Sequence, residues 1–326
     1  MKRPVAYIAG TGRGTPSTVF KNSDFGSIGI DTTDEWIVER TGIRTRHRAA
    51  PDQAVSDLAV EAAKKALAAA GRTPAEVDLI VVATTTADLT FPAAAAIVQR
   101  KLGAPQGIAF DVQAVCSGFV YALSVADGFV ARGHSKCALV IGAETMTRLM
   151  DWTDRGTCVL FGDGAGAVVV EPGEGRGDAG DRGLLGFALR CDGGKQDLLY
   201  VDGGPSTTGT IGCLRMQGNQ VFRHAVINIS EAVEAAAEAA GVPVSEVDWF
   251  IPHQANQRIL DATARRLKVA PQRFISTIED HGNTSAASVP LALDVAVRDG
   301  RIKRGDLILL EAMGGGLTWG AALLRW

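Results

Sequence analysis

Apolar residues follow two alternating spacings along this chain. Short uninterrupted apolar runs occur at Leu79–Ala83, Ile108–Val112 and Trp249–Pro252, and runs of this length between turn residues are typical of buried strands. Longer alanine-rich segments carry apolar residues every three or four positions and end at glycines such as Gly71 and Gly241, which indicates amphipathic helices. Strands that alternate with such helices predict sheets covered by helices, an α/β fold.

The two halves of the chain repeat one another. Three matching pairs, in order, are residues 69–78 with 239–248, 122–126 with 292–296, and 138–144 with 306–312. The first two pairs are 170 positions apart, so we predict two copies of one α/β unit, residues 1–172 and 184–326. The Gly- and charge-rich segment 172–183 is expected to be an exposed connection. A pseudo-twofold relation would bring the equivalent helix starts together, which makes the interface between the copies the expected active site.

Composition excludes several classes of protein. A chain of 326 residues with 46% hydrophobic content and a formal charge of -3 can bury substantial cores and has no field that would recruit nucleic acid or an anionic membrane. No apolar run approaches the roughly 20 residues of a membrane span, and the first ten residues do not resemble a signal peptide. The cysteines, Cys116, Cys137, Cys158, Cys191 and Cys213, lack the spacing of disulfide or metal motifs. We therefore expect a reduced, cytoplasmic protein without a metal site.

Cys116 is the first candidate for chemistry. It opens the apolar, helix-like run 116–123 soon after the predicted strand Ile108–Val112. A thiol at a helix start feels the positive end of the helix dipole, which predicts a lowered thiol pKa and a nucleophile. A buried, unreactive cysteine is the alternative. Two later loop-like segments supply His253 and Asn283 as polar partners, although a core histidine and an asparagine that caps the next helix are the alternatives there.

Several motifs together resemble one family. They are residues 115–118 (Val-Cys-Ser-Gly), 252–256 (Pro-His-Gln-Ala-Asn), 281–286 (His-Gly-Asn-Thr-Ser-Ala) and 314–320 (Gly-Gly-Gly-Leu-Thr-Trp-Gly), with 31–36, 153–157 and 161–166. In order and spacing these motifs resemble the thiolase-fold condensing enzymes, most closely the β-ketoacyl-acyl carrier protein synthase III family. The resemblance implies a five-layered αβαβα fold, with two duplicated α/β halves related by a pseudo-twofold axis, and a homodimer.

The same resemblance implies an acyltransferase of fatty acid biosynthesis. Its reaction is the decarboxylative Claisen condensation of a short acyl-CoA, such as acetyl-CoA, with malonyl-acyl carrier protein to give 3-oxoacyl-acyl carrier protein, CoA and CO2. Acyl-CoA and the malonyl-loaded acyl carrier protein are then the partners, and no further cofactor is implied. A cysteine suits this chemistry, because thioester exchange is nearly reversible and keeps the acyl group reactive.

The resemblance also assigns roles to individual residues. Cys116 is the nucleophile, while His253 and Asn283 donate hydrogen bonds to the malonyl thioester oxygen as it becomes an enolate. The backbone N–H groups of Cys116 and Gly315 form the oxyanion hole for the acyl intermediate. His281 lies outside the position that matches the family, and we interpret it as structural.

Binding residues are likewise implied by the resemblance. Trp36 and Arg155 would hold the adenine of CoA between them by stacking and a cation–π contact. The other implied CoA contacts are Thr32, Asn219 and Asn256. Phe91 would close the acyl pocket of a second subunit and favour a short primer. Met313 is the other implied acyl-pocket residue, and it stands before the glycine triplet where the family commonly carries Phe. The implied carrier-protein contacts are Gln254, Ala255, Asn256, Gln257, Arg258 and Arg223.

The motifs leave few competing interpretations. Residues 162–166 lack the GxGxxG order of a dinucleotide loop, and we predict a tight turn there before a strand at 167–170. Elongating synthases pair the cysteine with two histidines and thiolases carry a second cysteine in the C-terminal glycine-rich turn, and neither pattern is present. Chalcone-type and secondary-metabolite synthases share Cys, His and Asn and remain the alternative. A non-catalytic acyl-CoA or carrier-protein binding scaffold would be expected to have lost one of the three.

Overall fold

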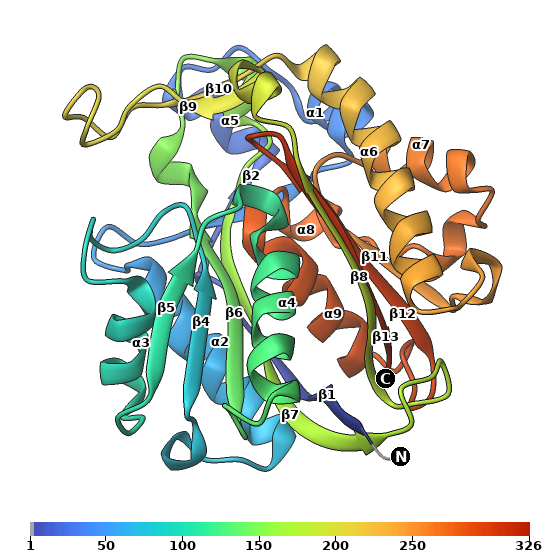
Figure 1. The fold of residues 1–326 in the computed structure, drawn as a ribbon. Coiled ribbons are helices and arrows are strands. Elements are labelled where there is room, and N and C mark those ends of the chain that lie inside the picture. The colour runs from blue at the N-terminus through green and yellow to red at the C-terminus, as the bar shows by residue number, and fades with distance from the viewer. Residues whose placement is uncertain (1–2) are drawn as a thin grey trace.

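The computed structural model describes residues 3–326 and contains, within them, two main sheets (Figure 1). The first has the order β1-β7-β6-β4-β5 and is formed by β1 (Arg3–Gly14), β4 (Leu79–Ala83), β5 (Ile108–Val112), β6 (Ala138–Thr145) and β7 (Asp163–Gly175). The second has the order β11-β12-β13-β8 and is formed by β8 (Gly183–Cys191), β11 (Trp249–Pro252), β12 (Leu307–Gly314) and β13 (Thr318–Arg325). The predicted bounds of β4, β5 and β11 are confirmed.

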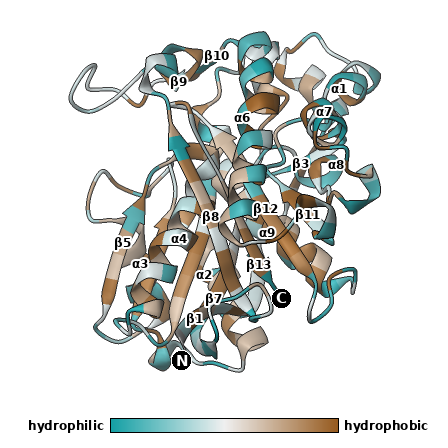
Figure 2. Ribbon diagram, turned by 45° about the vertical axis from the view of Figure 1, so that its right-hand side comes forward, coloured by the Kyte–Doolittle hydropathy of each residue, from teal (hydrophilic) through white to brown (hydrophobic). Residues whose placement is uncertain are grey.

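Helices cover both faces of each sheet and produce five layers. On the outer face of the first sheet lie α2 (Val55–Ala70) and α3 (Ala94–Leu102); between the sheets lie α4 (Gly118–Ala131) and α9 (Ser288–Arg298); on the outer face of the second lies α6 (Gly218–Ala239), beside α7 (Gln257–Leu267). The strands in the middle of these layers are among the most hydrophobic parts of the ribbon (Figure 2). The predicted αβαβα architecture is therefore confirmed. Across residues 3–326, none of the helices is sufficiently long and apolar for a membrane crossing.

The internal duplication is visible in the backbone. The 3-10 helix η3 (Val115–Ser117) precedes α4, and its counterpart η8 (Ser285–Ala287), 170 positions later, precedes α9. Each begins with a residue in the left-handed region, Val115 at φ 49° and Ser285 at φ 50°. The strands of the first sheet all come from one copy and those of the second sheet from the other. The division into domains at 1–172 and 184–326 stays a prediction. The exposed connection predicted at 172–183 is shorter than expected, because β7 extends into it as far as Gly175.

The interpretation of residues 162–166 as a tight turn is wrong. Most of this segment forms the start of β7, where it pairs with both β1 and β6. Its glycines serve close packing, because a Cβ on Gly166 would lie 2.5 Å from the backbone nitrogen of Leu291 in α9. On the neighbouring strand, a Cβ on Gly142 would overlap the carbonyl oxygen of Ala286. The glycines therefore let the helix layer between the sheets approach the first sheet.

Smaller elements gather around the upper ends of the sheets, most of them toward the top of Figure 1. They are the strand pairs β2 (Thr18–Lys21) with β3 (Thr45–Arg48) and β9 (Leu199–Val201) with β10 (Leu214–Met216), and the short helices α1 (Asp34–Thr41), α5 (Arg155–Cys158) and α8 (Ile278–His281). The start of α1 is set by Thr33, whose Oγ1 accepts a hydrogen bond from the N–H of Trp36 at 3.1 Å. Of these elements, α1, α5, β9 and β10 supply part of the wall around the site described next.

Candidate active site

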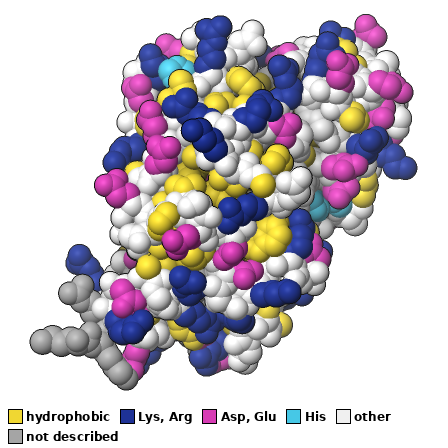
Figure 3. Space-filling view, turned by 90° about the vertical axis from the view of Figure 1, so that its right-hand side faces the viewer, with side chains coloured by type: hydrophobic (Ala, Val, Ile, Leu, Met, Phe, Trp, Pro, Cys, Tyr) yellow, Lys and Arg dark blue, Asp and Glu magenta, His cyan; other side chains and the backbone are white. Residues whose placement is uncertain are grey.

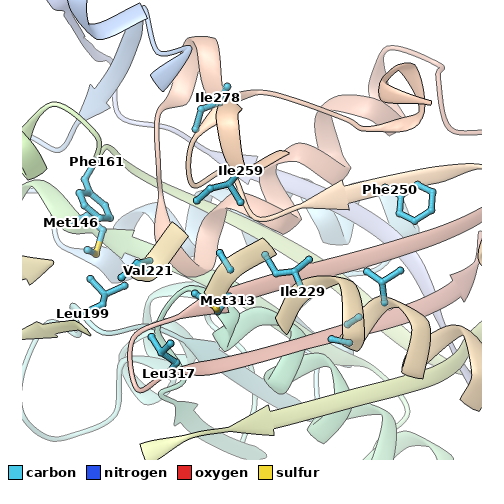
Figure 4. Packing of buried hydrophobic residues seen from close by; sticks show 14 of the residues in the cluster. Met146, Phe161, Leu199, Val221, Ile229, Phe250, Ile259, Ile278, Met313 and Leu317 are labelled. Carbon is cyan, nitrogen blue, oxygen red and sulfur yellow. The ribbon is translucent and has the colours of Figure 1, made fainter. Parts of the chain in front are cut away.

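A cavity of about 640 Å³ lies among α1, α6, α7 and the ends of β11 and β12. Cys116, His253 and Asn283 come from distant parts of the chain, and all three line it. Cys116 belongs to η3, His253 follows β11, and Asn283 lies between α8 and η8. Apolar residues of the wall that are labelled in Figure 4 are Phe161, Leu199, Val221, Ile229, Ile259 and Met313. An apolar cavity with a few convergent polar groups is typical of a small-molecule site.

Cys116 is buried, with 4% of its surface exposed. The left-handed backbone of Val115 turns the chain from β5 into η3 just before it. Burial raises the pKa of the Cys116 thiol to about 12. A hydrogen bond with Ser285 lowers this pKa, but its effect is smaller than that of burial. The prediction of a lowered thiol pKa is therefore wrong: the loss of hydration outweighs the helix dipole, and the thiol is neutral.

His253 is buried and uncharged. Only 4% of the residue is exposed, and burial lowers the pKa of its imidazole to about 3. Its backbone N–H donates to the carbonyl oxygen of Glu311 at 2.7 Å, which holds the chain beside β12 as it leaves β11. The ring Nδ1 lies 2.7 Å from Oγ of Ser288. Because Nδ1 is engaged there, Nε2 is the ring nitrogen left for the cavity.

Asn283 is held by its backbone and by one side of its amide. Its N–H donates to the carbonyl oxygen of Leu160 at 2.9 Å, and its carbonyl accepts from the N–H of Gly162 at 3.0 Å. The side-chain Oδ1 accepts from the N–H of Ser285 at 2.9 Å, so the residue also caps the turn that follows it. Since Oδ1 is engaged, the Nδ2 amide group is the part of the side chain that can donate into the cavity.

The glycine-rich turn between β12 and β13 lies directly against Cys116. A Cβ on Gly314 would lie 2.5 Å from the backbone nitrogen of Cys116, so this approach requires glycine. Thr318 Oγ1 donates to the carbonyl oxygen of Ala114 at 2.9 Å and ties the turn to η3. Gly315 follows in the same turn but is not among the described residues that line the cavity. Its part in an oxyanion hole stays a prediction.

Known proteins with similar sequences identify the family. Family models of 3-oxoacyl-[acyl-carrier-protein (ACP)] synthase III and of its C-terminal part match residues 110–193 and 237–326. The chain is 74% identical over 320 residues to the β-ketoacyl-[acyl-carrier-protein] synthase III of Caulobacter vibrioides, an alignment that covers 98% of this chain and 99% of that protein. The chain belongs to the 3-oxoacyl-[acyl-carrier-protein] synthase III family. Cys116, His253 and Asn283 all lie within the matched regions.

Solved structures agree with this assignment. The 3-oxoacyl-[acyl-carrier-protein] synthase III of Aquifex aeolicus matches with a TM-score of 0.92 at 46% identity, over 98% of this chain and 100% of that one. The priming β-ketosynthase of the R1128 polyketide biosynthetic pathway also matches with a TM-score of 0.92, at 38% identity, over 99% of this chain and 96% of that one. The thiolase-like fold is therefore that of the family.

The residues that the family resemblance assigns to CoA fall into two groups. Those that line the cavity are Trp36, Asn219 and Asn256, whereas Thr32 and Arg155 are not among its described lining residues. The guanidinium carbon of Arg155 lies 4.6 Å from the centre of the Trp36 ring, and Nη1 donates to the carbonyl oxygen of Asp31 at 2.7 Å. At this distance the two side chains stack directly, so an adenine ring can enter between them only after Arg155 moves.

Arg40 is a further residue near Trp36 that the motifs did not identify. It lines the cavity, and its guanidinium carbon also lies 4.6 Å from the centre of the Trp36 ring. The signal in the sequence was its spacing, because residues four positions apart on a helix such as α1 share one face. Two cations therefore flank this ring and would attract the phosphates of a nucleotide.

Most of the predicted carrier-protein contacts lie around the cavity. Those that line it are Arg223, Ala255, Asn256 and Arg258. Figure 3 shows Lys and Arg side chains around exposed apolar side chains on the face that carries α6 and α7. Gln257 is half-buried, and its Nε2 donates to Asp261 at 2.8 Å. This group of residues therefore stays a candidate docking surface, with one exception.

Gln254 is that exception, and its prediction as a carrier-protein contact is wrong. Only 1% of the residue is exposed. Its Nε2 donates to the carbonyl oxygen of Pro252 at 2.7 Å, and its Oε1 accepts from the N–H of Thr277 at 2.8 Å. The side chain thus bridges the end of β11 and the residue before α8, where a partner protein does not reach it.

Of the two predicted acyl-pocket residues, only Met313 belongs to the cavity of its own chain. Met313 is 5% exposed and lines the cavity, with its sulfur 4.0 Å from Nδ2 of Asn228. Phe91 is 83% exposed, in the segment between β4 and α3. A ring so exposed is free to contact a second molecule.

His281 packs away from the cavity, as expected for a structural residue. Its ring stacks on that of His47 with centroids 5.2 Å apart, and burial lowers its pKa to about 4. Neither histidine is among the described lining residues. In the part of the chain that the structure describes, no group of three or more His, Cys, Asp or Glu side chains is placed to hold a metal ion.

Proposed function

We propose that this protein condenses a short acyl-CoA with malonyl-acyl carrier protein, releases CO2 and CoA, and so initiates fatty acid synthesis. The observation that carries the proposal is the convergence of a cysteine thiol, a neutral imidazole and a primary amide on one cavity. Membership of the 3-oxoacyl-[acyl-carrier-protein] synthase III family supports the same reaction class.

Acylation is the first half-reaction. The Cys116 sulfur attacks the acyl-CoA carbonyl, the bond between that carbon and the CoA sulfur breaks, and the thiol proton leaves with CoA, so one thioester replaces another. The backbone N–H groups of Cys116 and Gly315 donate to the oxygen of the tetrahedral intermediate. Because burial raises the pKa of the Cys116 thiol to about 12, proton transfer accompanies the attack on bound substrate.

Condensation is the second half-reaction. The bond from the malonyl methylene carbon to its carboxylate breaks, CO2 leaves, and the electron pair forms an enolate at the thioester. His253 Nε2–H and Asn283 Nδ2–H donate to the enolate oxygen. The enolate carbon then attacks the acyl group on Cys116 and the bond from the acyl carbon to the cysteine sulfur breaks. The thiolate that leaves takes up one proton from solvent, which restores the neutral thiol. A histidine whose pKa lies near 3 suits this task, because it donates a hydrogen bond without being a cation.

Substrate binding follows the polar and cationic residues around the cavity. Trp36, with Arg155 displaced from its ring, holds the adenine of CoA. The residues assigned to the rest of CoA and its pantetheine arm are Thr32, Asn219 and Asn256. Those assigned to the acidic carrier protein are Arg223, Ala255, Asn256, Gln257 and Arg258, and their exposure or half-burial supports this assignment.

A homodimer in the cytoplasm completes the proposal. Leu89, Phe91 and Ile211 are 55%, 83% and 76% exposed, an apolar surface that a second copy would cover. A second cavity of about 750 Å³ beside this surface shares Leu199 with the active-site cavity. Phe91 of a second copy would close it and favour a short primer such as acetyl. The free state of the cysteines supports a reducing compartment.

Priming of polyketide synthesis is the second candidate function. It is favoured by the match to the R1128 priming β-ketosynthase at 38% identity, and the 74% identity to the Caulobacter vibrioides enzyme favours fatty acid synthesis. The two reactions share their chemistry and differ in the primer and the carrier protein. Competition between acetyl-CoA and longer or branched acyl-CoAs therefore separates them.

Intact-protein mass spectrometry after incubation with a panel of acyl-CoAs tests the function. We expect a single acetyl adduct, lost in Cys116→Ser together with condensation. In His253→Ala and Asn283→Ala we expect the adduct to persist while condensation falls by about 10²- to 10³-fold. A stoichiometric adduct in Cys116→Ser, or a His253 variant blocked chiefly in acylation, would contradict these roles.

A further inference from the structure

Ser288 is the first residue of α9 and lies against the catalytic histidine. Its Oγ is 2.7 Å from Nδ1 of His253, and the residues are 1% and 4% exposed. The same oxygen lies 3.4 Å from the backbone nitrogen of Gln254, which donates to it. Ser288 therefore contacts His253 at Nδ1 and leaves Nε2 free, so this hydrogen bond exists without any bound substrate.

The direction of the hydrogen bond follows from counting hydrogens. A neutral imidazole has one N–H, on either Nδ1 or Nε2. Ser288 Oγ already accepts from the N–H of Gln254, and among residues 3–326 its only other recorded partner is Nδ1 of His253. If Nδ1 carried the hydrogen, the hydroxyl hydrogen of this buried serine would have no acceptor. With the hydroxyl donating to Nδ1, both the Ser288 hydroxyl and Nδ1 are paired, and the imidazole hydrogen sits on Nε2, the ring nitrogen left for the cavity.

The duplicated half shows what this position does without a histidine. His253 and Ser288 correspond, 170 positions earlier, to Ala83 at the end of β4 and Gly118 at the start of α4. A Cβ on Gly118 would lie 3.2 Å from the Cβ of Ala83. The scaffold thus brings strand end and helix start into contact in both copies. Only the second copy places a hydrogen-bonding pair there, so packing alone does not require the hydroxyl.

We propose that Ser288 is a positioning residue that holds His253 as the Nε2–H tautomer and aims this hydrogen into the cavity. The inference rests on the proposed function for its catalytic consequence, because donation to the thioester oxygen requires a hydrogen on Nε2. Its structural content is independent of activity, since the tautomer is a property of the protein without substrate. Ser288 acts through His253 and needs no contact with substrate.

Nitrogen-15 NMR of protein labelled at histidine tests the tautomer directly. His253 is identified as the signal that disappears in His253→Asn. In the parent we expect a protonated Nε2 and a hydrogen-bonded, unprotonated Nδ1 at neutral pH. In Ser288→Ala we expect the Nδ1 resonance to shift as it loses its donor, and in Ser288→Thr to return toward the parent position. A protonated Nδ1 in the parent, or an unchanged Nδ1 resonance in Ser288→Ala, overturns the proposal.

Kinetics of the separate half-reactions test the consequence. Loss of one hydrogen bond to His253 should slow condensation about tenfold, leave acylation from acetyl-CoA unchanged, and be rescued in Ser288→Thr. Ser230→Ala is the matched control, because Ser230 is 1% exposed and its hydroxyl donates to the carbonyl of Val226 within its own helix. We expect this variant to leave the His253 NMR signals and the rates of both half-reactions as in the parent. Equal slowing of both half-reactions in Ser288→Ala overturns the positioning role. Failure of condensation in the parent would instead refute the proposed function and leave the NMR result to stand alone.

Discussion

Acid should destabilise this protein in part through His253. Burial lowers its pKa from 6.5 to about 3. As the pH falls, the unfolded chain therefore takes up a proton first, and stability that is present above pH 6.5 is lost below it. At pH 5 the solution is about 1.5 pH units below the pKa of the imidazole in the unfolded chain, which is therefore protonated, whereas the imidazole in the folded protein is still neutral. The free energy of unfolding is then lower by about 2 kcal/mol. The residue is 4% exposed, so solvent screens this effect little.

The perturbation is His253→Gln, which removes the titrating group and keeps a polar side chain of similar length. We expect the parent to lose about 2 kcal/mol more stability than the variant between pH 7 and pH 5. Urea unfolding of both proteins at each pH and one protein concentration measures this difference. His281, with its pKa lowered to about 4 by burial, and Glu311, with its pKa raised to about 8 by burial, titrate in both proteins and cancel.

A surface histidine provides the control. His134 is exposed, so His134→Gln should leave the difference between pH 7 and pH 5 as it is in the parent. If His253→Gln loses as much stability as the parent over this range, the imidazole is not held neutral by burial. The reasoning that makes it an uncharged donor to an enolate would then fail with it.

Three other perturbations test separate parts of the molecule. Gly142→Ala places a Cβ against the carbonyl oxygen of Ala286 and should cost about 3 kcal/mol in urea unfolding; a loss below 0.5 kcal/mol, on the order of a surface substitution, would show that α9 can move away. Trp36→Ala should raise the KM for acetyl-CoA about tenfold and leave acetyl-pantetheine unaffected, whereas equal effects on both would remove Trp36 from adenine binding. Arg258→Glu should slow stopped-flow association with malonyl-acyl carrier protein and weaken its salt dependence, with acylation by acetyl-CoA unchanged; equal association rates would place the docking surface elsewhere.

Local patterns were sufficient for three buried strands and for the duplication, but not for residues 162–166, where the predicted turn is the start of β7. The strands Leu79–Ala83, Ile108–Val112 and Trp249–Pro252 appear with the predicted bounds, because an uninterrupted apolar run between turn residues is itself the property that a buried strand needs. The offset of 170 recurs in the backbone, down to the left-handed residues Val115 and Ser285. Motif order also indicated which residues would meet in one cavity, although their roles stay proposals.

The electrostatic state of the site came only from the tertiary structure. A helix start predicted a lowered pKa for Cys116, yet burial raises it to about 12, because desolvation depends on neighbours from distant segments. The same holds for Gln254, which the motif placed at the surface and the fold buries at 1% exposure.

By itself, then, the sequence determined the alternation of strands and helices, the two copies and the residue types available for chemistry, since each is encoded in spacing along the chain. Tertiary packing decided which of those residues are buried, charged or satisfied. It stacked Arg155 on Trp36 and set Ser288 against His253. Such contacts join segments that are brought together by the packing of whole layers, and hydration, charge and hydrogen-bond direction are properties of that assembled environment.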